Sequence, residues 1–314
     1  MKFIIKKLSI LIVTVFIASI FGFIFEHLIP GNPAVAILGP QATPHNVAVL
    51  TTKLGLNKSP VQQYFTWIKN FFTGHFGYAY SSGDSVKTLI AQSYTETLEL
   101  IVGSQVLAFL IAIPISVRAA VKPNKLFDKF TSVISFGFYS FPAFVVAPIL
   151  ILIFAVKLGI VPASGYVGPS QSIGQNIKDM ALPCITLALG SFAVYSQILR
   201  SELVNLLKED FALFAKSKGI SKYKIVFKHC FRLSSLSLVT ISGLQISTLI
   251  TGAFVIEYIF QLPGLGTLII NAINSKDYLV IQAVSVLVVI VVATINTLVD
   301  ISYAFLDPRI RREN

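Results

Sequence analysis

Charged residues are scarce in this chain of 314 residues: they make up 12% of it, against about 25% in an average soluble domain. The deficit falls in long uncharged blocks, and 54% of the residues are apolar. This distribution is typical of a protein that crosses a membrane several times, and it argues against a soluble domain. The formal net charge of +11 therefore indicates lysine and arginine in cytoplasmic loops beside a lipid bilayer, and we expect no nucleic-acid partner.

Cysteine and histidine are equally few, with two and four copies. Cys184 and Cys230 form no CxxC pattern, which excludes a disulfide framework and argues against structural zinc. The histidines lack the spacing of metal ligands, so we expect no metal site. The sequence contains no Walker A glycine loop, no HExxH motif and no Ser-His-Asp pattern. We therefore expect neither ATP binding nor catalysis by this chain.

Six apolar runs are long enough to cross a membrane as helices, which takes about 20 residues. They are roughly Leu8–Leu28, Leu100–Val117, Phe130–Val156, Met180–Leu199, Leu233–Ile256 and Leu279–Val299. The third run is the longest and contains Gly137, Pro142 and Pro148. Because neighbouring helices can satisfy backbone groups that proline frees, we expect a tilt or kink in this run.

The first run has two interpretations. Lys2, Lys6 and Lys7 give it a basic start, and Ala34–Ala36 resembles a signal-peptide cleavage site. Its apolar core, however, is longer than the 7–15 residues usual for a signal peptide. We favour a retained anchor, so that residues 1–29 form an N-terminal transmembrane helix.

The distribution of lysine and arginine predicts the orientation. Most of the 25 basic residues lie in one alternate set of connecting segments. The predicted inner segments are 1–7, 118–129, 200–232 and 307–314, and the predicted outer segments are 30–97, 157–179 and 257–278. Both chain termini are therefore expected on the cytoplasmic side.

The outer segment 30–97 is mixed in character, and glycine and proline mark turns in it. Its aromatic residues include Tyr64, Trp67, Phe71 and Phe72. They fit either the core of a small extracytoplasmic subdomain or anchors at the membrane interface.

The inner segment 208–232, KEDFALFAKSKGISKYKIVFKHCFR, has the densest basic cluster of the chain. Its pattern predicts a short helix over Phe211–Ser217, with Glu209 and Asp210 at the positive end of the helix dipole. Gly219 then ends that helix, because glycine readily adopts the left-handed conformation found at helix C-termini. Ser221 is placed to cap a second helix.

The second helix is predicted to be amphipathic. Its expected apolar face comprises Tyr223, Val226, Phe227 and Cys230, and its basic stripe comprises Lys224, Lys228 and Arg232. Two interpretations stay open: a helix attracted to anionic lipid, or a docking element whose phenylalanines fill a groove on a cytoplasmic partner.

The fifth apolar run contains a stripe of small and polar residues at helical spacing, which are Thr240, Gly243, Ser247 and Thr251. Small residues mark close packing between membrane helices. A polar solute also needs small and polar side chains along its translocation path. Close helix packing and lining of the path therefore both stay open as interpretations of this stripe. The acids Glu257 and Asp300 lie at or near membrane depth, where acidic groups are usually functional or paired.

The stretch EDFALFAKSKGI resembles the cytoplasmic loop of binding-protein-dependent ABC importer permeases of the dipeptide, oligopeptide and nickel branch. The branch pattern E-D-Y/F-x-x-x-A-R/K-A/S-K-G is matched by Glu209, Asp210, Phe211, Ala215, Lys216, Ser217, Lys218 and Gly219. In the broader pattern E-A-A-x-x-x-G, Leu213 and Phe214 replace the glutamate and the first alanine. Further similar stretches are PGNP at 30–33, LGLNKSPVQQYFTW at 54–67, SFPAF at 140–144, VIEYIFQLPGLG at 255–266, KDYLVIQ at 276–282 and LDPRIR at 306–311.

The resemblance implies an all-α polytopic membrane protein with six transmembrane helices and the type I ABC importer permease fold. It implies a transmembrane domain over 98–306 with a coupling loop at 201–232, and a cytoplasmic tail at 307–314. The implied coupling residues are Glu209, Asp210, Phe211, Phe214, Ala215, Lys218 and Gly219. The implied outer gate or turn comprises Glu257, Pro263, Gly264 and Gly266.

The implied function is that of a permease subunit forming half of the path for peptides or a related small solute, in a bacterial cytoplasmic membrane. The alternative solute within the branch is nickel or a metal chelate. The implied partners are a second, homologous permease, two ATPase subunits that bind ATP and Mg, and an extracytoplasmic solute-binding protein. No cofactor is expected on this chain.

Two other classes of protein fit less well. A membrane-embedded enzyme needs clustered histidine or acidic groups within the spans, and a proton-coupled secondary transporter needs buried titratable groups for its relay. The six runs contain almost none of these. A secondary transporter would also not need the docking loop.

Overall fold

The structure is a computed structural model that describes residues 2–28, 32–39, 42–53 and 55–306. Parts of the predicted features fall outside these ranges: Pro30 and Gly31 of PGNP, Leu54, and the tail 307–314 with most of LDPRIR. Within the described ranges the regular secondary structure is helical, and outside the helices one isolated antiparallel bridge joins Tyr78 to Ser85. The predicted all-α class is confirmed.

The chain divides into two compact units, 1–96 with 263–297 and 97–262 with 298–314. Helices of the first unit are α1 (Lys2–Leu28), α2 (Pro33–Leu38), α3 (Pro44–Lys53), α4 (Pro60–Phe72), α12 (Leu265–Asn274) and most of α13 (Tyr278–Leu306). Helices of the second unit are most of α5 (Val86–Val121), α6 (Leu126–Ser140), α7 (Ala143–Leu150), η2 (Ile151–Lys157), α8 (Ile173–Leu206), α9 (Asp210–Ser217), α10 (Lys222–Ile225), η3 (Val226–Cys230) and α11 (Phe231–Phe260).

The six predicted apolar runs all fall on helices. Among the described residues, five helical segments are long and apolar enough to span a membrane, and there are six if the bent pair α6 and α7–η2 counts as one. The helices extend beyond the predicted runs: α5 begins at Val86, and α10, η3 and α11 form one stretch from Lys222 to Phe260. The short apolar helix α12 was not predicted, because its 10 residues are too few to span a bilayer.

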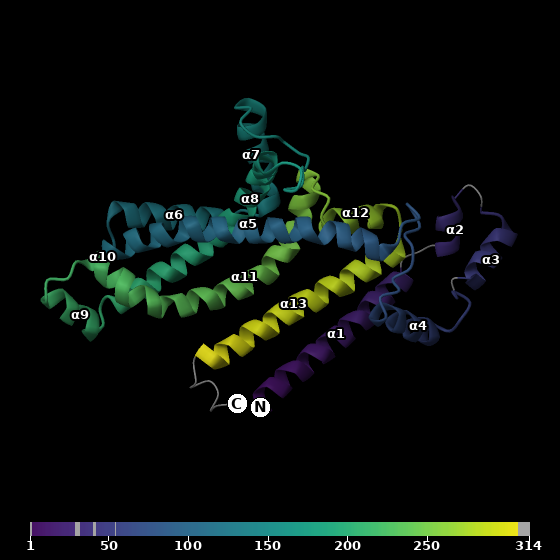
Figure 1. The fold of residues 1–314 in the computed structure, drawn as a ribbon, viewed down its shortest axis with the longest axis horizontal. Helices are drawn as coiled ribbons and strands as arrows, with labels where there is room; N and C mark the ends of the chain where they lie inside the picture. Colours follow the sequence, from purple (N-terminus) through teal and green to yellow (C-terminus); the bar gives the residue numbers. More distant parts are fainter. Residues whose placement is uncertain (1, 29–31, 40–41, 54, 307–314) are drawn as a thin grey trace. The chain divides into compact units, whose positions relative to one another are not determined.

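The third run is broken rather than kinked, with a bend of 105° between α6 and α7. Phe141 takes an extended conformation, as a residue before proline commonly does, and Pro142 then precedes α7. Two consecutive extended residues interrupt the helix completely, and α7 turns away from α6 (Figure 1).

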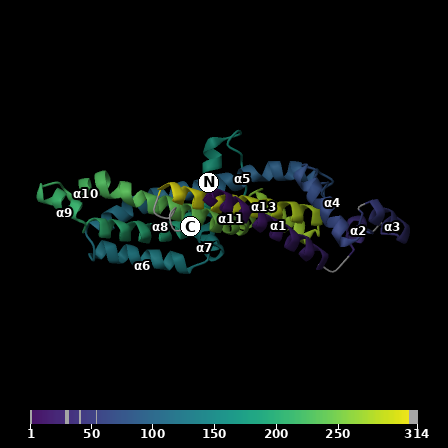
Figure 2. The same cartoon turned by 90° about the horizontal axis from the view of Figure 1, so that it is seen from below.

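In the second unit α8 is the central helix and packs against α6, α7 and α11 (Figure 2). Its buried side chains Tyr195, Leu199 and Leu203 belong to one apolar cluster that also receives residues from α5, α9, α10, η3 and α11. The short helix α9 is therefore built onto the same core as the long helices.

In the first unit an aromatic cluster joins α4 to α1. Tyr64 packs edge-on against Phe23 with ring centroids 5.4 Å apart, and Trp67 lies 6.0 Å from Tyr64 and 5.8 Å from Phe71. Tyr64 and Phe71 are buried, whereas Phe72 is exposed. Tyr64, Trp67 and Phe71 therefore pack together on α1, one of the predicted spans, and the extracytoplasmic subdomain stays a prediction.

Asp277 joins three segments of the first unit. Its backbone N–H donates to Ala272 O at 2.8 Å and ends α12, and its carbonyl accepts from Ile281 N at 3.1 Å and starts α13. Its fully buried carboxylate accepts from the Ser81 backbone N–H at 3.1 Å and the Ser81 hydroxyl at 3.2 Å. The side chain thus holds the hairpin-like turn before α5 against the α12–α13 corner.

We expect Asp277→Ala to destabilise the first unit by about 1–3 kcal/mol, because it removes the charged acceptor that the Ser81 N–H and the Ser81 hydroxyl share. Ser81→Ala should cost about 1 kcal/mol, and the double variant should cost less than the sum of the two. Thermal unfolding of the purified protein in detergent measures these changes. Strictly additive effects would contradict the contact between the two side chains.

Candidate functional site

The predicted short helix of the cytoplasmic segment is present as α9. It begins at Asp210, and Glu209 occupies the N-cap position without a side-chain capping bond. Asp210 lies in the first turn, where a negative charge suits the helix dipole. The predicted start and end of this helix are confirmed to within one residue.

Gly219 forms the corner after α9 with a left-handed φ of +78°. Its N–H donates to Lys216 O at 3.0 Å, and the Ile220 N–H donates to Ala215 O at 3.2 Å. This pair of bonds is the Schellman motif, in which a left-handed residue reverses the chain and satisfies the last carbonyls of a helix. Open space surrounds the position where a Cβ would stand, so the requirement for glycine here comes from the backbone alone.

The second helix starts as predicted, and its predicted apolar face is buried in part. Ser221 caps it by accepting a bond from Lys224 N at 3.5 Å. Val226 and Cys230 are buried, whereas Tyr223 and Phe227 are exposed. Residues 226–230 form the π-helical turn η3, whose larger number of residues per turn rotates side chains away from the 3.6-residue period that the prediction assumed.

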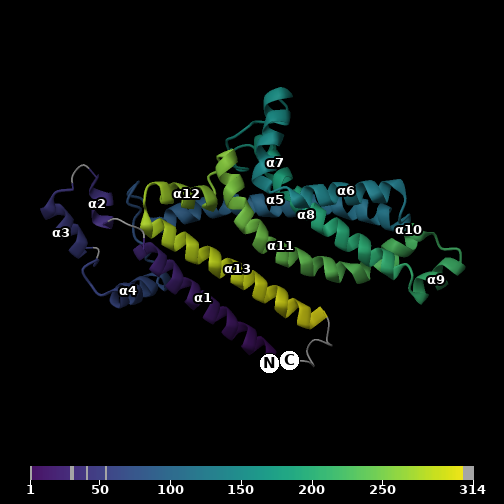
Figure 3. The same ribbon diagram turned by 180° about the vertical axis from the view of Figure 1, so that it is seen from behind.

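The two faces of α9 differ in the size of their side chains. Ala212 and Ala215 are buried in the apolar cluster of the second unit. Phe211 and Phe214 are exposed, Phe214 to 62%, and the Lys218 ammonium lies 4.4 Å from the centre of the Phe214 ring. The helix therefore exposes two aromatic rings and a lysine. The α9 ribbon itself lies beyond the ends of α8 and α11 (Figure 3).

The stripe on α11 changes character along its length. Thr240 and Gly243 are buried, Ser247 is half-buried and Thr251 is exposed. A Cβ at Gly243 would overlap the side chain of Val299 on the last part of α13. Close packing therefore explains Gly243, whereas Ser247 and Thr251 lie at the more open end of the stripe.

The outer turn begins where α11 ends. Glu257 is fully buried in the last turn of α11, and Gln261 takes a left-handed φ of +56°. Leu262 N donates to Glu257 O at 2.9 Å and Gln261 N to Tyr258 O at 3.3 Å, so a second Schellman motif ends this helix. Of the other predicted residues, Pro263 is exposed, Gly264 is the N-cap of α12, and Gly266 is buried in its first turn.

The sequence analysis did not predict a group of hydrogen bonds inside the second unit that centres on Gln105. The Tyr195 hydroxyl donates to Gln105 Oε1 at 2.7 Å, and Gln105 Nε2 donates to the Ser242 carbonyl at 3.4 Å. The Phe109 ring stacks on Tyr195 at 4.9 Å. One glutamine thus connects α5, α8 and α11, and its position as a lone amide in an apolar run was the signal that could have revealed it.

A second missed feature is the loop between η2 and α8. Gly165 N donates to Phe260 O at 3.2 Å, and the Tyr166 hydroxyl donates to Glu99 at 2.7 Å. The N–H of Val167 binds Asp179 at 2.9 Å. Three consecutive loop residues therefore connect to α11, α5 and α8, and this loop holds the three helices together.

These features define a class: an α-helical membrane protein with several spans, in which a short exposed helix is packed onto the ends of two long ones. Among the described residues no group of three or more His, Cys, Asp and Glu side chains is placed to hold a metal ion.

The family follows from two matches. Residues 112–312 match the family described as "Binding-protein-dependent transport system inner membrane component", and residues 1–101 match the corresponding N-terminal family. The chain belongs to this family, in the peptide branch of ABC importer permeases, and is a multi-pass inner-membrane permease subunit of an ABC importer.

Two similar proteins align with this chain over nearly its full length. The chain is 35% identical over 311 residues to the "Glutathione transport system permease protein GsiC" of Escherichia coli strain K12, covering 99% of both chains. It is 32% identical over 309 residues to the "Probable peptide ABC transporter permease protein y4tP" of Sinorhizobium fredii, covering 98% of this chain and 99% of that protein.

A solved structure of the MetNI methionine ABC transporter, in an inward-facing conformation, matches with a TM-score of 0.55 and 20% sequence identity. The match covers 70% of this chain and 96% of the other. This likeness confirms the expected type I permease fold.

We expect Gly243→Ala to destabilise the protein by about 1–3 kcal/mol through overpacking against Val299. Val299→Ala in the same chain should restore most of the loss, because it removes the methyl groups that meet the new Cβ. Gly137→Ala is the matched control, since nothing lies within 4 Å of its Cβ position. Melting temperatures in detergent measure the series, and a destabilised Gly243→Ala that Val299→Ala leaves unrepaired would contradict this packing.

Proposed function

We propose that this chain forms half of the translocation path of an ATP-driven importer for peptides, and that α9 couples it to the ATPase. The peptide class is supported by relatives named for glutathione and for peptides, each aligned over nearly the whole chain. No observation favours nickel or a metal chelate over a peptide.

The remaining components follow the family. A second, homologous permease completes the path, two separate ATPase subunits bind ATP and Mg, and an extracytoplasmic binding protein delivers the solute. Both termini and α9 lie on the cytoplasmic side, as the excess of lysine and arginine in the inner segments indicates. The segment 30–97 faces outward and is the proposed docking surface for the binding protein.

One observation supports the coupling role most strongly: α9 buries alanines and exposes phenylalanines. An isolated chain gains nothing from exposing Phe211 and Phe214, and aromatic side chains of this kind are typical anchors in a partner's groove. The buried face places Ala212 and Ala215 against the cluster that contains Leu203 of α8. A displacement of the exposed face is therefore passed to the long helices.

The ends of those helices are also connected directly. The Ser237 hydroxyl of α11 donates to Glu202 of α8 at 3.1 Å. When the ATPases close on ATP, we infer that α9 moves with them and that α8 and α11 move with α9. Thr240, Gly243, Ser247 and Thr251 on α11 then shift relative to the path, which gives the two states that alternating access requires.

Gly219→Val is expected to abolish uptake while the complex still assembles, because a β-branched residue cannot adopt φ near +78° without strain. Gly219→Asn is the matched control, since asparagine tolerates the left-handed region. Uptake of a labelled peptide by proteoliposomes containing the whole transporter, measured beside ATP hydrolysis, tests this. Equal uptake by the valine and asparagine variants would refute the role of the corner.

Phe214→Asp is expected to weaken capture of the ATPase by this chain by about 2 kcal/mol or more, as loss of an aromatic anchor commonly does. Phe72→Asp is the control, since Phe72 is also exposed but lies on the proposed outer side. Co-purification of the subunits from detergent-solubilised membranes measures the effect. Undiminished ATPase recovery with Phe214→Asp would argue against docking through α9.

A further inference from the structure

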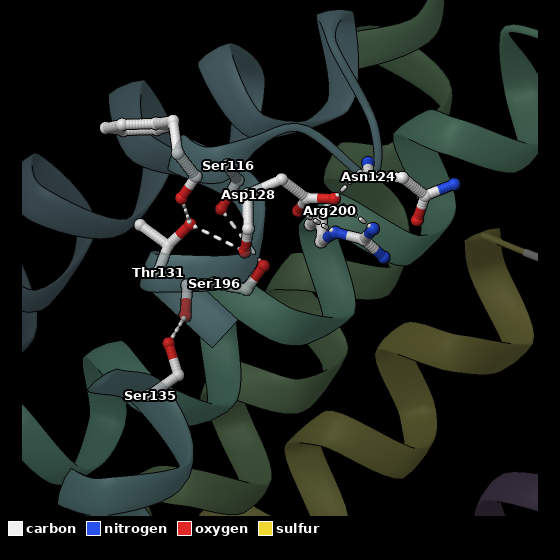
Figure 4. Close-up of polar contacts among 8 residues, drawn as sticks. Ser116, Asn124, Asp128, Thr131, Ser135, Ser196 and Arg200 are labelled. Atoms are coloured by element: carbon white, nitrogen blue, oxygen red, sulfur yellow. Dashed lines mark hydrogen bonds and ion pairs between the residues drawn. The ribbon is translucent and has the colours of Figure 1, made fainter. Parts of the chain in front are cut away.

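The turn between α5 and α6 is held by one carboxylate. Asp128, in the first turn of α6, accepts from the backbone N–H of Asn124 at 2.7 Å, and Asn124 has a left-handed φ of +63°. The same carboxylate accepts from Arg200 Nε at 2.5 Å and from an Arg200 terminal nitrogen at 2.6 Å (Figure 4). Arg200 lies on α8, so the ion pair joins the turn to the central helix.

The ion pair between Asp128 and Arg200 holds α6 and α8 in a fixed relative position. Asp128 is 2% exposed, and a buried charge is stable only when partners satisfy it fully. The guanidinium meets the carboxylate with two nitrogens, which fixes direction as well as distance. Nearby, Ser116 donates to the Ser196 carbonyl at 3.1 Å, and Ser135 and Ser196 share a hydrogen bond at 2.9 Å (Figure 4). Helices α5, α6 and α8 are therefore fastened together beside the turn.

The turn also reaches the other side of the coupling corner. The Lys222 ammonium lies 3.5 Å from the carbonyl oxygen of Val121, the last residue of α5. Lys222 is the first residue of α10, directly after the corner formed by Gly219 and Ser221. A cation suits the negative end of a helix. The turn thus contacts both the helix that enters the coupling segment and the helix that leaves it.

We propose that the α5–α6 turn is a brace for the coupling segment, in which Asp128 and Arg200 are positioning residues that make α5 and α6 move with α8. This proposal rests on the coupling role assigned to α9 above. Without the brace, α9 still docks and the ATPases still hydrolyse ATP. The movement of α9 then shifts α8 relative to α5 and α6 and is not passed on to those two helices. The loss should therefore appear in solute moved per ATP and not in assembly.

The test uses the complete transporter in proteoliposomes, with ATP hydrolysis and labelled-peptide uptake measured on the same preparation. Asp128→Asn keeps an acceptor for Asn124 but removes the charge that holds Arg200. We expect subunit recovery and ATP hydrolysis within about twofold of the unchanged transporter, and uptake per ATP lowered by about tenfold, the scale of effects along a coupling route. Lys129→Gln, an exposed charge change on the same helix with no expected effect, is the control.

Two further variants keep the test decisive. Arg200→Lys retains the charge but cannot form the two-nitrogen contact, and Lys222→Met removes the weaker contact from an exposed position. Both should lower uptake per ATP by less than Asp128→Asn does. Unchanged uptake per ATP in Arg200→Lys and Lys222→Met overturns the brace, as does a proportional loss of uptake, hydrolysis and assembly in all three variants. Failure of the proposed coupling role itself would look different, because Phe214→Asp would then retain the ATPase.

Discussion

A helix leaves its last carbonyl groups without partners inside the helix, so each break between helices in this protein has to satisfy them in another way. Three breaks do so in the same way, with a left-handed residue that turns the chain while two N–H groups bind back to the helix. Those residues are Gly219 after α9, Gln261 after α11 and Lys276 after α12. The corners fix where α9 and the outer turn can lie, so the placement of the candidate coupling residues depends on them.

The same three corners explain how far the sequence could predict the fold. Gly219 was predicted as a corner because glycine enters the left-handed region at no steric cost. Gln261 and Lys276 adopt the left-handed region although their side chains disfavour it, and no local sequence pattern predicts this conformation. The six apolar runs were predictable because the bilayer sets their length. The 105° break at Phe141–Pro142 exceeded the predicted kink, because a proline signals a weak point but not how many neighbouring residues become extended.

The coupling helix shows a different limit of sequence reasoning. Both faces of α9 are apolar, so periodicity could not decide which one is buried. Size decided it: Ala212 and Ala215 allow α9 to approach the core closely, whereas Phe211 and Phe214 would hold it away. In the following helix the period itself changed, since the π-helical turn at Val226–Cys230 exposes Phe227. The resemblance to a family loop placed the segment correctly, but only the packing shows which side chains are left for a partner.

Membrane helices gain little from burying apolar surface against one another, because lipid tails are equally apolar. Single polar residues in otherwise apolar stretches therefore do much of the work of fixing neighbours. Gln105 joins α5, α8 and α11 in this way, and just beyond the predicted spans the pair Asp128 and Arg200 joins α6 to α8. Both sets of contacts involve α8, the helix that leads into α9. A transporter that alternates between two states must either keep such contacts or break them together, and a two-nitrogen ion pair to a buried carboxylate is costly to break. Helices α5, α6 and α8 should accordingly move as one body, and the change between states should fall at contacts that lack such ties.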